Sequence, residues 1–354
     1  MWRQWLALVI GLSSMACGDD PAPAATSASG TGAGGSGGAG VGGSGGDAGG
    51  GGDAGGGGQS QDGWTTLASL GQGNRQENAV VALDGMVYVV GGFDAAIQVV
   101  NSVERYDPAE DAWMLVAPLP QAVHHANAAV VSGKLYVLGA LRDLSFTAVG
   151  DTYVYDPAAD TWTAVAPMPA GTERGSAAVG VIEGQIYLAG GYRGGSVADV
   201  SVYDPAGDTW QALPDLPEAR DHLVGAAMDG VLYAIGGRNG GIGELRGQVD
   251  AFDPIAGAWT SRAPMPTARG GAAAGVVGSR IYVVGGEGNP DADTGVFDSN
   301  EAYDPAADAW TIETPMITPR HGTGAAGVGG VLYVPGGATE QAFGAVATNE
   351  SFTP

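Results

Sequence analysis

The chain has very little cysteine and few basic residues. Its 354 residues include one cysteine, Cys17, and one lysine, Lys134. A single cysteine excludes a disulfide within the chain. Lys and Arg together number 14 against 38 Asp and Glu, which gives a formal net charge of −24. Because such a surface repels phosphate backbones, the composition argues against nucleic acid as a partner.

Large apolar side chains are almost absent between residues 18 and 62, where Gly, Ala and Ser dominate. Such a segment buries too little surface to offset its ordering entropy, so it is predicted to be a flexible linker. No Lys-Ser or Lys-Thr pair follows its glycines, which excludes a phosphate-binding loop. The rest of the chain, residues 63–354, has no pattern of an amphipathic helix.

The first 17 residues have the features of an export signal. Arg3 precedes an apolar run from Trp5 to Leu12, which is too short to span a bilayer. Ser14-Met15-Ala16-Cys17 resembles a bacterial lipobox, although leucine is usual where Ser14 stands. The resemblance implies that Cys17 is acylated and anchors an exported lipoprotein at the outer membrane, the cell surface or the periplasmic face. The alternative is an ordinary signal peptide with an incidental cysteine.

Glycine is abundant, with 64 residues, and some of the glycines belong to a repeated sequence motif. An apolar run ends in Tyr-x-x-Gly-Gly, and a later Tyr-Asp-Pro or Phe-Asp-Pro stands shortly before a Trp. The first glycines stand at positions 91, 139, 190, 236, 285 and 336, so the repeat length is 46–51 residues. In the second copy the pair is Gly139-Ala140, so one glycine is lost.

Each copy predicts four short strands. A small apolar strand, such as residues 78–83, is followed by a tight two-residue turn and by the Tyr-containing strand. A variable loop leads to the third strand, and the Trp opens the fourth. The Asp of Asp-Pro precedes that Trp by six residues, and a second acid often stands between them. Because these acids recur in several copies, they are predicted to cap turns rather than to catalyse.

The sixth copy has no Trp after Phe352. The missing segment has a match near the other end, because Trp64-Thr-Thr-Leu67 is similar to Trp162-Thr-Ala-Val165. We therefore expect this N-terminal segment to supply the outer strand of the last sheet. Such closure removes an exposed sheet edge.

On these motifs residues 63–354 resemble a six-bladed kelch β-propeller, an all-β fold closed by an N-terminal outer strand on the last blade. Kelch domains are mostly interaction platforms, so the resemblance implies a monomeric module that binds a protein or a carbohydrate through its loop face. Some exported six-bladed kelch proteins interconvert sialic-acid anomers or epimers with an acid and an Arg at the channel mouth. Glu244 with Arg246, or Glu77 with an Arg, would be the counterparts here. The galactose-oxidase branch needs a cysteine joined to a tyrosine near copper, which this chain does not offer.

Kelch repeats also carry an Arg sixteen residues before the first glycine. It is present in five copies, and Val123 replaces it in the second: Arg75, Arg174, Arg220, Arg269 and Arg320. Because it belongs to the repeat, we predict that it bonds neighbouring turns. A ring of guanidinium groups that binds an anion is the alternative.

Two residues after this Arg is a position that, in kelch interaction domains, often points into the mouth of the central channel. Unlike the rest of the repeat it differs between copies: Glu77, His125, Ser176, His222, Gly271 and Gly322. We take the first four as candidate ligand-binding residues. Glu77, His125 and His222 could converge on a cation or act as acid and base; the alternative is a solvated polar rim. Spacing assigns no further ligand, so neither a metal nor a cofactor is predicted.

The variable loops supply the remaining candidates for ligand binding: Arg142, Tyr192, Arg193, Arg238, Glu244, Arg246 and Glu287. Asp291 and Asp293 alternate before Gly295 as in a calcium loop, but the other acidic ligands of an EF-hand are absent. Calcium binding there is left open. No nucleophile–base pair stands out, so a binding module is favoured over an enzyme.

Overall fold

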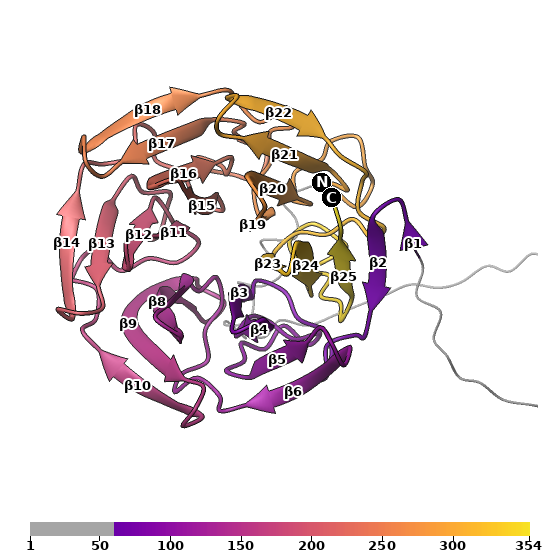
Figure 1. The fold of residues 1–354 in the computed structure, drawn as a ribbon, viewed down its shortest axis with the longest axis horizontal. Helices are drawn as coiled ribbons and strands as arrows, with labels where there is room; N and C mark the ends of the chain where they lie inside the picture. Colours follow the sequence, from indigo (N-terminus) through magenta and orange to yellow (C-terminus); the bar gives the residue numbers. More distant parts are fainter. Residues whose placement is uncertain (1–59) are drawn as a thin grey trace, which may run out of the picture. The chain divides into compact units, whose positions relative to one another are not determined.

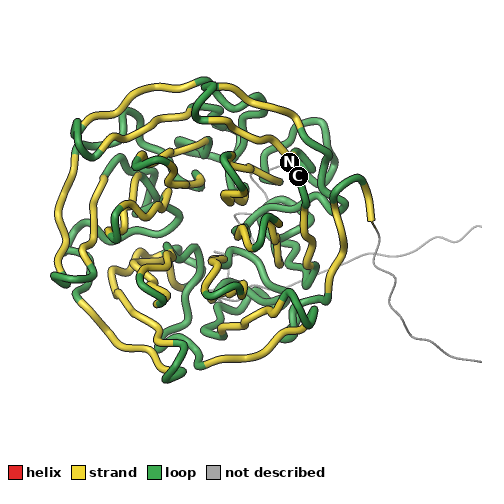
Figure 2. Tube along the Cα trace, viewed as in Figure 1, coloured by secondary structure: helices red, strands yellow, loops and turns green. Residues whose placement is uncertain are grey.

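The computed structural model describes residues 60–354, which form six antiparallel sheets arranged around a central axis (Figures 1 and 2). Five sheets have four strands and one has five. Over this range there is no helix that is long and apolar enough to cross a membrane. The signal segment with Cys17 and residues 18–59 of the linker lie outside the described residues.

In the first three blades the strands follow the chain from the inner strand outwards, and in blade 2 the two middle strands are longer than in the other blades. Blade 1 consists of β3 (Ala79–Leu83), β4 (Met86–Val90), β5 (Val103–Asp107) and β6 (Ala112–Val116). Blade 2 consists of β7 (Ala128–Val131), β8 (Lys134–Arg142), β9 (Thr147–Asp156) and β10 (Thr161–Val165). Blade 3 consists of β11 (Ala178–Ile182), β12 (Gln185–Ala189), β13 (Val200–Asp204) and β14 (Thr209–Leu213).

Blades 4 and 5 repeat this order, and blade 6 combines both ends of the described chain. Blade 4 consists of β15 (Val224–Met228), β16 (Val231–Ile235), β17 (Val249–Asp253) and β18 (Ala258–Arg262). Blade 5 consists of β19 (Ala273–Val277), β20 (Arg280–Val284), β21 (Asn300–Asp304) and β22 (Ala309–Ile312). Blade 6 consists of β23 (Ala326–Val328), β24 (Val331–Pro335), β25 (Asn349–Phe352), β2 (Trp64–Leu67) and β1 (Ser60–Gln61).

The inner strands are built from small residues because neighbouring blades crowd together near the axis. A Cβ atom on Gly180, in β11, would come 2.6 Å from Leu232 Cδ1 of the next blade. The second strands are buried on both faces, since each lies between two other blades, and this explains their continuous apolar runs.

The Trp of each outer strand bonds the blade before it. In every blade the indole N–H donates to a backbone carbonyl of the preceding blade or of the segment that leaves it, over 2.8–3.0 Å. The second acids accept hydrogen bonds from a Tyr hydroxyl of their own blade and from a backbone N–H 42–45 residues away: Asp111, Asp160, Asp208 and Asp308. The second acids therefore bond the preceding blade rather than cap a turn. The Asp of Asp-Pro does cap its turn, because it accepts the backbone N–H two residues further on, so the prediction is confirmed for these first acids.

In blade 6, β2 pairs antiparallel with β25, with Trp64 opposite Phe352 (Figure 1). One detail differs from the sequence prediction, which assigned residues 60–62 to the linker. Asp62 and Gly63 both have positive φ, and this tight turn folds Ser60 and Gln61 back onto β2 as β1. The described fold thus includes residues before position 63.

Blade 2 also differs from the prediction of a variable loop in every blade. The second glycine of the other pairs adopts φ of 89–120° and ends the strand there. Ala140 replaces it in blade 2, and β8 and β9 continue past this point after a bulge between Leu138 and Ala140. Consequently Arg142 lies at the end of a strand, exposed to solvent, and only four residues connect it to β9.

The repeat arginines are at most 1% exposed. They bond backbone carbonyls of their own blade, and four of them also face a carboxylate on the third strand: Glu104, Asp250, Glu301 and Glu350. In blade 3 Arg174 donates to carbonyls and to Ser201 Oγ at 2.9 Å instead. With their guanidinium groups inside the blades, these residues are structural, as predicted, and they form no anion-binding ring.

Candidate functional site

The six divergent repeat positions form a ring around the central channel. All six residues have φ between 51° and 64°. The backbone N–H of each donates to the preceding member of the ring, at the carbonyl or, for His222, at Ser176 Oγ. All six line a cavity of about 190 Å³. The ring therefore holds its side chains at one mouth of the channel on a closed backbone frame.

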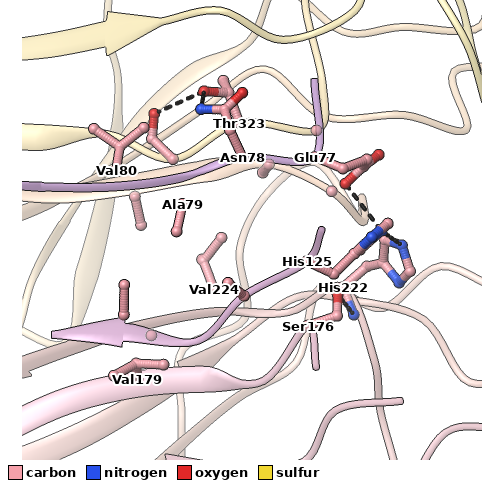
Figure 3. Close-up of a pocket in the computed structure, with 18 of the residues that line it drawn as sticks. Glu77, Asn78, Ala79, Val80, His125, Ser176, Val179, His222, Val224 and Thr323 are labelled. Atoms are coloured by element: carbon pink, nitrogen blue, oxygen red, sulfur yellow. Dashed lines mark hydrogen bonds and ion pairs between the residues drawn. The ribbon is translucent and has the colours of Figure 1, made fainter. Parts of the chain in front are cut away.

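All four histidines of the chain gather at this mouth. His125 Nε2 lies 3.0 Å from Glu77 Oε2 and 3.0 Å from His222 Nε2 (Figure 3). His124 Nδ1 lies 2.6 Å from His125 Nδ1, and His321 Nδ1 lies 3.7 Å from Glu77 Oε1. We define the mouth cluster as these residues together with three polar neighbours: Glu77, His124, His125, Asp221, His222, Arg238, Glu287 and His321.

The outer partners of the imidazoles fix where their protons sit. His124 Nε2 donates to the carbonyl of Asp143 at 2.9 Å, so its Nδ1 accepts from His125 Nδ1. On the other side His222 Nδ1 donates to Asp221 Oδ1 at 2.5 Å. With both Nδ1 atoms protonated, the Nε2 atoms of neutral His125 and His222 carry lone pairs that face each other and Glu77.

Arg238 connects the acids of the cluster. Its Nε donates to Asp221 Oδ1 at 3.1 Å and its Nη1 to Glu287 Oε1 at 2.7 Å. Its Nη2 lies 3.2 and 3.0 Å from the two ring nitrogens of His222. Both distances are within hydrogen-bonding range, so the guanidinium of Arg238 also holds the imidazole of His222 in place.

Burial disfavours a charge on two of the imidazoles, His124 and His222. Burial, followed by the nearby His125, lowers the pKa of His124 to about 3. Burial and the charge of Arg238 lower the pKa of His222. Burial alone would raise the pKa of Glu77, but His125, His321 and His222, when protonated, outweigh it and lower that pKa. Three carboxylates thus face one guanidinium, which leaves a net charge of −2 with neutral imidazoles.

A glycine at one ring position makes room for the cluster. A Cβ on Gly322 would come 2.5 Å from Glu77 Oε1, whereas a Cβ on Gly271 would make only an ordinary contact, 3.6 Å from His321 Nδ1. The divergence of this position between repeats therefore reflects packing as well as chemistry, because blade 6 has no side chain where that of Glu77 extends from blade 1.

Three groups in the mouth could hold a metal ion. One ligand atom each from Glu77, His125 and His222 lie within 4.8 Å of one another, and no other such group of three is present in residues 60–354. Asp291 and Asp293 are exposed and belong to no group of this kind. Ser176, the remaining ring candidate, lines the cavity but uses its hydroxyl to accept the N–H of His222.

Of the seven loop candidates, the structure brings only Arg238 and Glu287 into the mouth cluster. Arg193 pairs with Asp199 at 2.9 Å, and Arg246 pairs with Glu218 at 2.8 Å. Glu244 and Arg142 are exposed. Glu244 and Arg246 therefore do not supply the acid and the Arg of the channel mouth.

Sequence reasoning missed three members of the cluster, His124, Asp221 and His321. Each stands directly before the ring position, where Gln76, Gly175 and Gly270 occupy the other blades. This position also differs between copies, and each of its residues pairs with the residue after the Gly-Gly position of its blade. That divergence was the signal that could have found them.

Aromatic rings border the mouth cluster on one side. Phe146 lies 4.9 Å from His124 and 5.4 Å from His125 between ring centroids, and Tyr192 lies 6.3 Å from Phe146. Phe93 packs 4.2 Å from His124 and 5.7 Å from Phe343, whose side chain is partly exposed. The mouth therefore combines polar groups with the half-buried rings of Phe146 and Tyr192 beside them.

Comparisons with known proteins identify the repeats. A family model described as the KLHDC2/KLHL20/DRC7 Kelch-repeats domain matches residues 60–237, and the Kelch motif matches residues 219–266 and 268–317. No curated protein matches the chain.

Among solved structures, one titled "Structure of YjhT" is similar, with a TM-score of 0.67. The alignment has 16% identity and covers 80% of this chain and 95% of that chain. At this identity the likeness shows the fold alone. Because 770 solved chains match, the fold by itself does not select a function.

Proposed function

The chain belongs to the kelch-repeat family, and on that premise we propose that its propeller is a binding module for a small carbohydrate at the channel mouth. The observation that carries this proposal is the convergence of Glu77, His125 and His222, from three blades, on one cavity, with Asp221 bonded behind His222. Ligand sites combine apolar and aromatic walls with a few precisely placed polar groups. The mouth cluster and its aromatic border have this composition.

A small sugar suits the site better than a protein surface does. The cavity of about 190 Å³ admits a compact polar molecule, whereas a protein partner needs a broad contact area. Carboxylates and imidazoles of the cluster can accept and donate hydrogen bonds to hydroxyls. Phe146 and Tyr192 can pack against the apolar face of a sugar ring.

We predict that a small sugar raises the melting temperature of the purified protein. A ligand at a hundred times its Kd stabilises a protein by about 2.7 kcal/mol, which corresponds to a rise of several degrees. The measurement is a thermal-shift screen with neutral hexoses and sialic acids, run in the presence of a chelator so that metal ions do not contribute.

Two variants make this screen specific. Tyr192→Ala removes a rim aromatic outside the hydrogen-bonded network and should reduce the shift. Glu244→Gln alters an exposed acid outside the cluster and should leave the shift unchanged. No shift with any sugar would reject the carbohydrate and favour a protein partner.

A second candidate function is a carbohydrate-active enzyme of the sialic-acid epimerase or mutarotase type. It is favoured by the contact between Glu287 and Arg238 at 2.7 Å beside the pair Glu77–His125, which together offer an acid, a base and a fixed positive charge. Proton NMR of a freshly dissolved sialic acid distinguishes the candidates. An enzyme accelerates anomer equilibration or epimerisation, whereas a binding module leaves the rate unchanged.

We also propose that the propeller is exported and anchored through a lipid on Cys17. This proposal rests on the position of the single cysteine directly after Ser14-Met15-Ala16. Cys17→Ser should transfer the protein from the membrane fraction to the soluble fraction, as measured by fractionation and immunoblotting. A variant that stays with the membrane would place the anchor elsewhere.

A further inference from the structure

Three electron-pair donors meet at the channel mouth with no hydrogen between them in the neutral tautomers described above. They are Glu77 Oε2, His125 Nε2 and His222 Nε2. Lone pairs that face one another at 3.0 Å repel unless a cation lies among them. We propose that Glu77, His125 and His222 form a binding site for a divalent metal ion of the zinc type. This inference does not depend on the mouth binding a sugar.

The spacing of the donors suits such an ion. Zinc binds His nitrogen and carboxylate oxygen at about 2.0–2.2 Å, so tetrahedral ligands lie about 3.3 Å apart. The two measured donor separations are 3.0 Å, and the third is within 4.8 Å. Small side-chain movements would bring all three donors to one ion.

The outer contacts of the two histidines are those of a metal site. His222 donates its Nδ1 proton to a buried carboxylate, Asp221, and His125 donates its own to His124. Metal-ligating histidines usually direct their second nitrogen to such a partner, which orients the ring and raises its basicity. Arg238 in turn holds Asp221 in place over 3.1 Å.

The charge of the mouth cluster also fits a divalent ion. Its three carboxylates and one guanidinium leave a net charge of −2 when the imidazoles are neutral. A buried excess of this size is costly unless it is compensated. One divalent cation neutralises this net charge of −2, so no further basic side chain is needed.

The donor set selects among ions. Two imidazoles and one carboxylate suit zinc and neighbouring transition metals, whereas calcium and magnesium prefer oxygen ligands only. Three protein ligands leave a fourth position for water or a ligand in the cavity, as in catalytic zinc sites. The alternative to a metal ion between these donors is a single proton on His125 Nε2 that forms a hydrogen bond with Glu77.

The test is a titration of the purified full-length chain after removal of metals with a chelator. Calorimetry with Zn²⁺ should show one equivalent bound with a Kd of about 1 μM or lower, and Co²⁺ should give the visible absorption of a low-coordinate site. His125→Ala and His222→Ala should each weaken Zn²⁺ binding at least 100-fold. Asp221→Asn, which changes only the partner of His222, should weaken binding by about 10–100-fold.

Controls distinguish the site from adventitious binding. Asp293→Asn and Glu244→Gln remove exposed acids outside the cluster and should leave the affinity unchanged. If the alanine variants do not fold, two further measurements test the site. Zn²⁺ should raise the melting temperature of the wild type, and His222→Gln, which keeps a polar side chain of similar size, should bind Zn²⁺ more weakly than the wild type. The proposal is overturned if the metal-free wild type binds no Zn²⁺ saturably, which would leave a proton as the occupant. It is equally overturned if folded histidine variants bind as tightly as the wild type.

Discussion

A chain that begins at Gln72 should unfold at a far lower temperature than one that begins at Ser60, and should aggregate. The truncation removes β1, β2 and the segment that joins blade 6 to blade 1. We expect a loss of at least about 5 kcal/mol, which is the whole stability of many natural domains. Thermal unfolding, with light scattering to detect aggregation, measures the difference.

The size of this loss follows from what the removed segment contacts. Trp64 is 1% exposed, stacks 5.1 Å from Phe352 and donates its indole N–H to the carbonyl of Thr314 in blade 5. Ala68 accepts the indole N–H of Trp113 and donates to Asp111, both in blade 1. Removing β2 therefore exposes the edge of β25 and breaks contacts to both neighbouring blades.

Two milder changes serve as controls. A chain that begins at Gly63 loses only β1 and should melt close to the longer chain. Trp64→Ala should cost about 3–5 kcal/mol, since it empties a buried aromatic site, whereas Trp259→Ala removes a partly exposed ring and should cost less. Equal melting temperatures for chains that begin at Ser60 and at Gln72 would rule out any role of β2 in closing the propeller.

The sequence predicted the repeated part of the fold because every blade must satisfy the same environment. Asp111 and Trp113 recur at matching positions since each bonds the preceding blade in the same way, and Tyr106 recurs because its hydroxyl donates to Asp111. One substitution in the pattern had a consequence that was not predicted. Ala140 in place of the second glycine lets β8 and β9 continue, which shortens the loop of blade 2.

The position of the candidate site in each repeat could be predicted from the sequence, but the contacts between its residues could not. Divergence between repeats identified Glu77, His125 and His222, and the structure places them at one channel mouth. Their separations depend on rotamers and on closure of the ring, because His125 and His222 are 97 positions apart in the sequence. No spacing rule for metal ligands spans such distances.

The buried arginines give the second large expected effect. Arg220→Met should destabilise the protein by about 3–5 kcal/mol, because it leaves the Asp250 carboxylate buried without its counter-charge. The two groups are 2.6 Å apart, and their side chains are 0% and 2% exposed. Chemical denaturation at pH 7 measures the loss.

Blade 3 provides a matched control for this loss. Arg174 occupies the same repeat position, also donates to backbone carbonyls of its own blade, and faces Ser201 rather than an acid. Arg174→Met should therefore cost less than Arg220→Met. Adding Asp250→Ser to Arg220→Met recreates the acid-free environment of blade 3 and should recover part of the stability.

The pH dependence identifies the buried charge as the cause. Burial already raises the pKa of Asp250, although Arg220 opposes the shift. Without Arg220 that pKa rises further above its value in the unfolded chain. A carboxyl of this kind favours the folded state while it is protonated, and the benefit is lost as the pH rises through the folded pKa. The excess cost of Arg220→Met over Arg174→Met should therefore shrink as the pH falls from 7 towards 5. An excess that is independent of pH would mean that lost packing and carbonyl contacts, rather than an unpaired carboxylate, account for the difference.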